Sequence, residues 1–242
     1  MRPVLLIARR ELASLFATPL GLVALVAFLA AQGTLTFTLG GFFARGQADL
    51  AAFFAPLPWV LVPFTAALTM RLWAEERRSG TIELLMTLPV SPEQAVLGKF
   101  LGAWGFCVLA LALCAPFVAT VNLLGQPDNG AIACGFAGAA LLAAALAAIG
   151  EAMSALARSQ AVAFLAAICV GGALVACATP MAAEVLASAP MLSRLAGALS
   201  LLARFERLAD GLLSLADVAM LASVAAAWLL AASLALRRWP GP

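Results

Sequence analysis

The stretch that decides the fold is AIACGFAGAALLAAALAAIGEAM, residues 131–153, in which Glu151 is the one charged side chain. At about 1.5 Å of rise per residue, an apolar helix of this length crosses the roughly 30 Å hydrocarbon core of a bilayer. Lipid offers no partner to backbone N–H and C=O groups, so a stretch buried in lipid must be helical. Residues 131–153 therefore predict a transmembrane helix.

Further stretches of similar length and composition flank this one on both sides. The six predicted spans are roughly residues 20–42, 53–73, 97–121, 131–153, 160–178 and 214–236. We expect Pro116 to kink the third span near one end, because proline removes a helical hydrogen bond. The prediction is an all-α membrane protein in which residues 1–242 form a single transmembrane domain.

Composition supports this class and excludes several functions. Hydrophobic residues make up 64% of the chain and charged residues 11%, against roughly 45–50% and about 25% in soluble domains. A net charge of +2 without a basic tract argues against a nucleic-acid partner. The chain has no histidine and no C-x-x-C pair, so the usual zinc and haem ligands and a Ser-His or Cys-His nucleophile are missing. We expect no enzyme activity and no bound metal or cofactor.

Basic residues are distributed unevenly between the two sides that six spans would create. The side with both termini receives Arg2, Arg9, Arg10, Arg71, Arg77, Arg78, Lys99, Arg158, Arg237 and Arg238. The other side receives Arg45, Arg194, Arg204 and Arg207. By the positive-inside rule, both termini are expected in the cytoplasm, which for a bacterial chain means a multi-pass protein of the inner membrane.

Two segments outside the spans have amphipathic patterns. Residues 3–18 carry an apolar stripe interrupted by Arg9, Arg10 and Glu11, which predicts an amphipathic helix in the cytoplasmic interface. Residues 179–213 show two helix starts, at Thr179-Pro180 and at Ser188-Ala189-Pro190. These predict short outer helices that either enter the outer leaflet or lie on its surface.

The connection between the second and third spans is charged and patterned. Residues 71–81 read RLWAEERRSGT and are followed by IELLM, a short amphipathic stretch that Pro89 stops. Ser91-Pro92-Glu93-Gln94 then has the pattern of a capped helix start. Basic residues alone would anchor such a hairpin to the membrane surface. Carboxylates interleaved with them indicate that another protein docks there.

This loop, with the Leu88-Pro89-Val90-Ser91 that ends it, resembles the cytoplasmic loop of exporter-type ABC permeases. The closest subgroup contains the gliding-motility permease and the permease for nitrous-oxide-reductase maturation. Weaker matches extend the likeness over essentially the whole chain, at Arg10-Glu11, Pro127–Gly130, Ala157–Gln160 and Phe205-Glu206. The family usually carries an aromatic residue in place of Asn129 and an apolar one in place of Glu151.

The resemblance implies a permease that works as a homodimer, or with a homologous permease, and is driven by a separate cytoplasmic ABC ATPase that binds ATP and Mg²⁺. An extracytoplasmic accessory protein often accompanies this subgroup. The helix around residues 81–86 would be the coupling helix. By this likeness the ATPase interface comprises Glu75, Glu76, Arg77, Arg78, Ser79, Gly80, Thr81, Glu83, Leu84 and Leu85. The chain itself has no phosphate-binding loop, since Gly98-Lys99 is preceded by Glu93 where the first glycine would stand.

Glu151 has two interpretations at this stage. It is either a polar group in the translocation path or at the dimer seam, or a carboxylate that reaches the inner interface or pairs with Arg158.

Two alternative functions also stay open. An ion-coupled secondary transporter would need ionisable groups near the midplane, where the spans have almost none, and a haem-exporter-type ABC permease would share the mechanism and differ in cargo.

Overall fold

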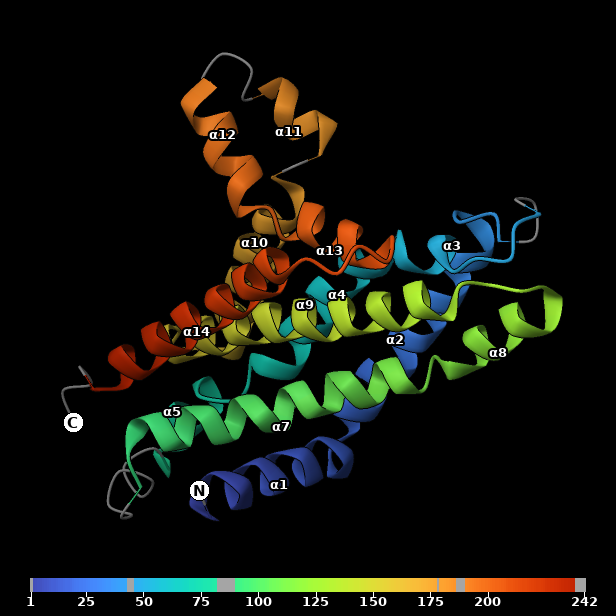
Figure 1. Ribbon diagram of the computed structural model, residues 1–242. Helices are drawn as coiled ribbons and strands as arrows, with labels where there is room; N and C mark the ends of the chain where they lie inside the picture. The colour runs from blue at the N-terminus through green and yellow to red at the C-terminus, as the bar shows by residue number, and fades with distance from the viewer. Residues whose placement is uncertain (1, 43–45, 82–89, 178, 186–189, 238–242) are drawn as a thin grey trace.

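The computed structural model describes residues 2–42, 46–81, 90–177, 179–185 and 190–237, and within these ranges the chain is helical and has no strand (Figure 1). In chain order the helices are α1 (Arg2–Ala17), α2 (Pro19–Thr38), α3 (Ala51–Phe54), α4 (Leu57–Thr69), α5 (Ala74–Arg78), α7 (Pro92–Ala112), α8 (Ala115–Leu124), α9 (Asn129–Leu156), α10 (Gln160–Ala176), α11 (Pro180–Val185), α12 (Pro190–Leu199), α13 (Leu201–Ala209) and α14 (Leu215–Arg237).

Five helical stretches are long and apolar enough to cross a membrane: Pro19–Thr38, Leu57–Arg78, Pro92–Leu124, Asn129–Leu156 and Leu215–Arg237. They match five of the six predicted spans. The stretch predicted as the span 160–178 forms α10, an apolar helix of 17 residues that is shorter than the others. The all-helical membrane fold is therefore confirmed with five candidate spans rather than six.

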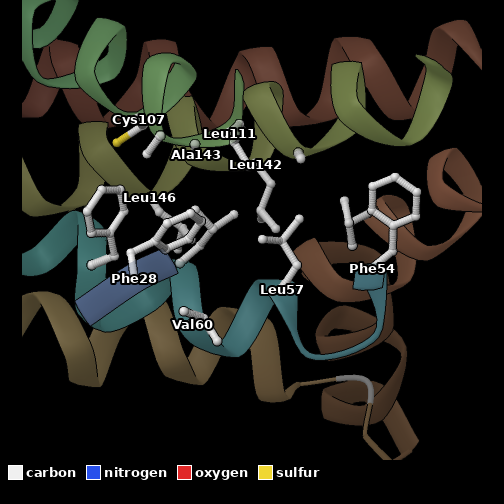
Figure 2. Packing of buried hydrophobic residues seen from close by; sticks show 14 of the residues in the cluster. Phe28, Phe54, Leu57, Val60, Cys107, Leu111, Leu142, Ala143 and Leu146 are labelled. Carbon is white, nitrogen blue, oxygen red and sulfur yellow. The ribbon is translucent and has the colours of Figure 1, made fainter. Parts of the chain in front are cut away.

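Burial separates the spans into a centre and a periphery. About two thirds of the apolar window of α9 (67%) and of the stretch Leu57–Arg78 (72%) is buried, against 22% for α2 and for α14. The alanine-rich sequence of α9 explains its place, because small side chains let neighbouring helices approach closely on every side. Figure 2 shows the contact that results, with Leu142 of α9 and Leu57 of α4 meeting in the interior beside Phe28 of α2.

Two of the predicted spans are interrupted at prolines. The third span breaks where α7 ends at Ala112 and α8 begins at Ala115, which confirms the kink expected near Pro116. The second was expected as one helix over 53–73, but α3 ends at Phe54 and α4 starts at Leu57, because Pro56 intervenes. Helix ends leave carbonyls without intrahelical partners. The buried side-chain amide of Gln32 supplies one, donating from Nε2 to the carbonyl of Phe53 at 2.7 Å.

The amphipathic helix predicted at the N-terminus is α1, and it packs lengthwise on α7. A Cβ added to Gly98 would lie 2.7 Å from Cβ of Ile7, and one added to Gly102 would lie 2.6 Å from Cβ of Glu11. Glycines four residues apart share a helix face and let two backbones approach, as in G-x-x-x-G contacts. Leu5 and Leu6 are exposed on the opposite face of α1. The interfacial position expected for this helix stays a prediction.

The segment 179–213 forms three short helices. Helices begin at Pro180 and Pro190, as the sequence predicted, and a third begins at Leu201, where the side chain of Ser200 caps α13. The buried carboxylate of Asp217, at the start of α14, holds α13 in place. Arg204 Nη1 donates to its Oδ1 at 3.0 Å, and Arg207 Nε donates to its Oδ2 at 2.8 Å.

The glycine contact gives a first prediction. Gly102→Ala is expected to lower the apparent midpoint of heat unfolding in detergent, because the new methyl group would overlap Glu11 and overpacking costs about 1–3 kcal/mol. Tryptophan fluorescence during heating measures this. Gly105→Ala is the matched control, since a Cβ at Gly105 meets nothing within 4 Å. Equal midpoints for the two variants would contradict the close packing of α1 on α7.

Candidate functional site

The charged connection begins where α4 ends, at the end of the bundle that also carries α1 and the last turn of α14 (Figure 1). Residues 70–73 form a turn, α5 runs from Ala74 to Arg78, and Gly80 adopts a left-handed conformation with a φ of 72°. The coupling helix expected around 81–86, with Glu83, Leu84 and Leu85, lies outside the described residues apart from Thr81. The next helix starts as predicted, with a complete capping box between Ser91 and Gln94.

The turn between α4 and α5 is held by a hydroxyl from α9. Ser154 Oγ donates to the carbonyl of Met70 at 3.0 Å and accepts from the backbone N–H groups of Trp73, at 3.0 Å, and of Ala74, at 3.2 Å. A helix end and a helix start both leave backbone groups unpaired. One buried serine from a distant helix satisfies groups of both kinds, so the turn has a fixed position on α9.

On its other side the turn is held by Lys99 of α7, whose side chain is fully buried. The ammonium group contacts Glu76 Oε1 at 2.6 Å and Glu11 Oε1 of α1 at 3.6 Å. It also donates to the carbonyl of Leu72 and lies 4.3 Å from the ring centre of Trp73. Buried charges require partners, and three of the contacts of Lys99 are with residues 72–76.

Glu151 of α9 lies in the same cluster. Its Oε1 accepts from Trp73 Nε1 at 2.9 Å, and its side chain is 0% exposed. Among the residues that the structure describes, its Oε2 has no hydrogen-bond partner. The hydrogen bond to Trp73 replaces the pairing with Arg158 that was considered from the sequence, since Arg158 is exposed to solvent. The role of Glu151 in a translocation path or at a dimer seam stays a prediction.

Arginine side chains complete the attachment of the connection to the bundle. Arg71 donates from Nη1 to Thr18 Oγ1 at 2.9 Å and from Nη2 to Ser14 Oγ at 3.0 Å, which ties the turn to the end of α1. Arg77 Nη1 donates to the carbonyl of Ala157, just after α9, at 3.2 Å. The connection is thus bound to α1, α7 and α9 together.

Among the residues proposed from the sequence as an interface, those that the structure describes divide into two groups. Glu76 and Arg77 turn toward the bundle, where they make the contacts just described. The exposed group comprises Glu75, Arg78, Ser79, Gly80 and Thr81. The connection therefore has a bonded face and a solvent-facing face that carries both charges and hydroxyl groups.

Lys99, Trp73 and Ser154 are residues that sequence reasoning did not single out. A signal was present for Lys99, because a lysine inside a predicted span is costly and indicates a functional site. It was instead counted among the flanking positive charges. Trp73 and Ser154 lie in chain segments far apart in sequence, so their contact has no local signature.

The opposite end of the bundle contains two adjoining hollows. One, of about 200 Å³, is lined by residues that include Asp49, Asp128 and Asp210. The other, of about 300 Å³, lies between α3 and α13 beside Glu206, whose pKa is raised by partial burial and by the charge of Asp210. Within the described part of the chain, no group of three or more Asp, Glu or Cys side chains is placed to hold a metal ion.

Comparison with protein families decides the class of this chain. A family model described as "ABC-2 family transporter protein" matches residues 21–236, which is most of the chain and all five candidate spans in part or whole. The chain belongs to the ABC-2 transporter family. No curated protein gives a significant match. As an ABC-2 permease the chain is a multi-pass membrane transport subunit, of a kind that normally works with a cytoplasmic ATPase partner.

The attachment of the turn to α9 gives a second prediction. Ser154→Ala is expected to destabilise the permease by about 1–3 kcal/mol, because it leaves buried backbone groups of residues 70, 73 and 74 without a partner. The apparent midpoint of heat unfolding in detergent measures this. Ser223→Ala is the control, since the Ser223 hydroxyl is exposed and donates to the carbonyl of Met220 in its own helix. A midpoint unchanged in both variants would contradict the capping role of Ser154.

Proposed function

We propose that this permease is the membrane-spanning subunit of an exporter-type ABC transporter related to the gliding-motility and nitrous-oxide-reductase-maturation permeases, and that residues 74–91 receive the movement of a separate ATPase. ATP and Mg²⁺ bind to that partner, and this chain carries no catalytic residue. The observation that carries the proposal is the two-faced connection, bonded to three helices on one side and solvent-facing on the other.

A segment that transmits force has to be stiff where it joins the bundle and accessible where a partner binds. Ser154, Lys99 and Arg71 supply the first property through buried contacts. Glu75 and Arg78 supply the accessibility to a partner, because both are exposed charges on one short helix. The capped start of α7 at Ser91 returns the chain to the bundle, so the connection joins α4 at one end and α7 at the other.

The proposed arrangement in the membrane has six spans, with α10 as the fifth. Its 17 residues reach about 26 Å at 1.5 Å per residue, which is close to the roughly 30 Å of hydrocarbon. Residues 1–242 then act as one domain with both termini in the cytoplasm of the bacterial inner membrane. The uneven distribution of arginine supports this orientation, because Arg77, Arg78 and Arg158 all belong to the end that carries α5.

The functional unit in this proposal contains a second permease copy, or a homologous permease, and an extracytoplasmic accessory protein. α10 is one of the spans whose surface leaves room for a second copy. Its buried residues, Ala163, Ala167, Gly171 and Val175, recur every four positions and form one narrow stripe. Val162 and Leu165 lie exposed on the remaining surface, where lipid or a second copy would cover them.

The exposed face of α5 gives a third prediction. The double reversal Glu75→Lys with Arg78→Glu is expected to reduce copurification of the ATPase with the tagged permease by roughly tenfold or more, as loss of a few charged interface contacts would. Quantitative mass spectrometry of the complex isolated in mild detergent measures this. Asp210→Lys, an exposed charge reversal at the opposite end, is the matched control. Wild-type ATPase recovery with the double reversal would exclude this face as a docking surface.

Orientation gives a fourth prediction. In a variant without native cysteines, Ser79→Cys is expected to react with a membrane-impermeant maleimide only after the inner membrane of spheroplasts is opened. Leu213→Cys, an exposed position between α13 and α14, should react in intact spheroplasts. Labelling of residue 79 from outside intact spheroplasts would show that no cytoplasmic ATPase can reach the connection.

A further inference from the structure

The connection between α4 and α5 is held by two attachments that differ in chemistry and lead to different spans. On one side the ammonium of Lys99, from α7, contacts the carbonyl of Leu72, the ring of Trp73 and the carboxylate of Glu76. On the other side the hydroxyl of Ser154, from α9, holds the backbone on both sides of the turn. Segment 72–76 thus lies between two helices and is bonded to each of them separately.

The contact at Lys99 is strong and its geometry is specific. Its ammonium lies 2.6 Å from Glu76 Oε1 in a side chain that is 0% exposed, so water screens this ion pair much less than one at the surface. The pair between Glu93 and Arg237 at the same end of the bundle is screened by water, since the two side chains are 41% and 59% exposed. Movement of α5 relative to α7 would separate buried charges. Because this separation costs free energy, the two helices are expected to move together.

Lys99 is surrounded by more negative than positive groups. Glu76 and Glu11 both contact it, Glu151 lies within electrostatic range, and the guanidinium of Arg10 approaches Glu76 to 3.7 Å from a largely exposed side chain. Removing the lysine would leave carboxylates together in a buried site. The lysine therefore holds residues 72–76 against α7.

We propose that Lys99 is a positioning residue that carries the movement of segment 72–76 to α7, while Ser154 carries the same movement to α9. This inference rests on the proposed function, since it assigns the route by which an ATPase acting on residues 74–91 moves the spans. One segment would then drive two spans through two attachments that can be removed one at a time.

The experiment uses the complex of permease and copurified ATPase, with ATP, Mg²⁺ and orthovanadate as the probe. Spin labels are placed at Leu97 on α7 and at Leu156 on α9, each paired with a label at Leu215 at the opposite end. All three positions are exposed. Labelled chains are diluted with unlabelled ones, so that the measured distances lie within one chain. Trapping is expected to change both distances in the wild-type permease.

Lys99→Met is expected to abolish the distance change at Leu97 and keep the change at Leu156, with ATPase recovery and nucleotide trapping as in the wild type. Ser154→Ala should do the reverse. Lys99→Arg, which retains the positive charge, should restore the change at Leu97. The double variant Lys99→Met with Glu76→Gln should behave like Lys99→Met, and it avoids an unbalanced buried carboxylate if the single variant folds poorly. Glu93→Gln is the control and should keep both changes.

Two outcomes would overturn the assignment of Lys99. One is a distance change at Leu97 that persists in both lysine variants. The other is the loss of both changes in each of Lys99→Met and Ser154→Ala, which would indicate one undivided attachment. A wild-type permease that traps nucleotide without moving either label would also overturn the inference and leave the docking proposal standing. Failure of the wild-type chain to retain any ATPase would instead overturn the proposed function.

Discussion

The structure depends on one constraint: a helix that ends inside an apolar bundle must find partners for the backbone groups that it leaves free. α4 ends at Thr69, α5 starts at Ala74, and the turn between them is enclosed by α7 and α9. Ser154 and Lys99 supply the missing partners. Because those partners come from other spans, satisfying the backbone also fixes the charged connection on the bundle. The same contacts that make the fold possible make the connection suitable for transmitting movement.

Most of the fold could be predicted because lipid imposes simple rules on the sequence. Apolar stretches of sufficient length had to be helical in lipid, Pro116 favoured a break in its helix, and the residues from Ser91 to Gln94 favoured a cap on the next one. The break at Pro56 was missed because the sequence on both sides of it is apolar enough for one continuous helix. Contacts between helices could not be predicted either, since the sequence around Gly98 and Gly102 does not indicate that α1 packs on them.

The candidate site was predictable in place but only partly in composition. The alternation of charges over residues 71–81 located the connection, because such a pattern has no use in lipid. It could not say which charges face the partner. The packing of α5 on α7 determines which charges face a partner. Glu76 contacts the buried Lys99, whereas Glu75 is exposed to solvent. Adjacent glutamates in one short helix thus have different surroundings for a reason that lies in another helix, α7, and not in their own sequence.

The packing of α1 on α7 has a consequence for biogenesis. α1 is synthesised before α7, so the glycine surface that receives it belongs to a span made later, and Glu11 meets Lys99 only then. At ribosomal speeds of about 5–20 residues per second, the N-terminal helix waits on the order of several seconds for that surface. During this interval the face of α1 that packs on α7 lacks that neighbour, while the contacts of Arg71 with Ser14 and Thr18 can already form. The packing of α1 on α7 therefore forms only after the third span has been synthesised.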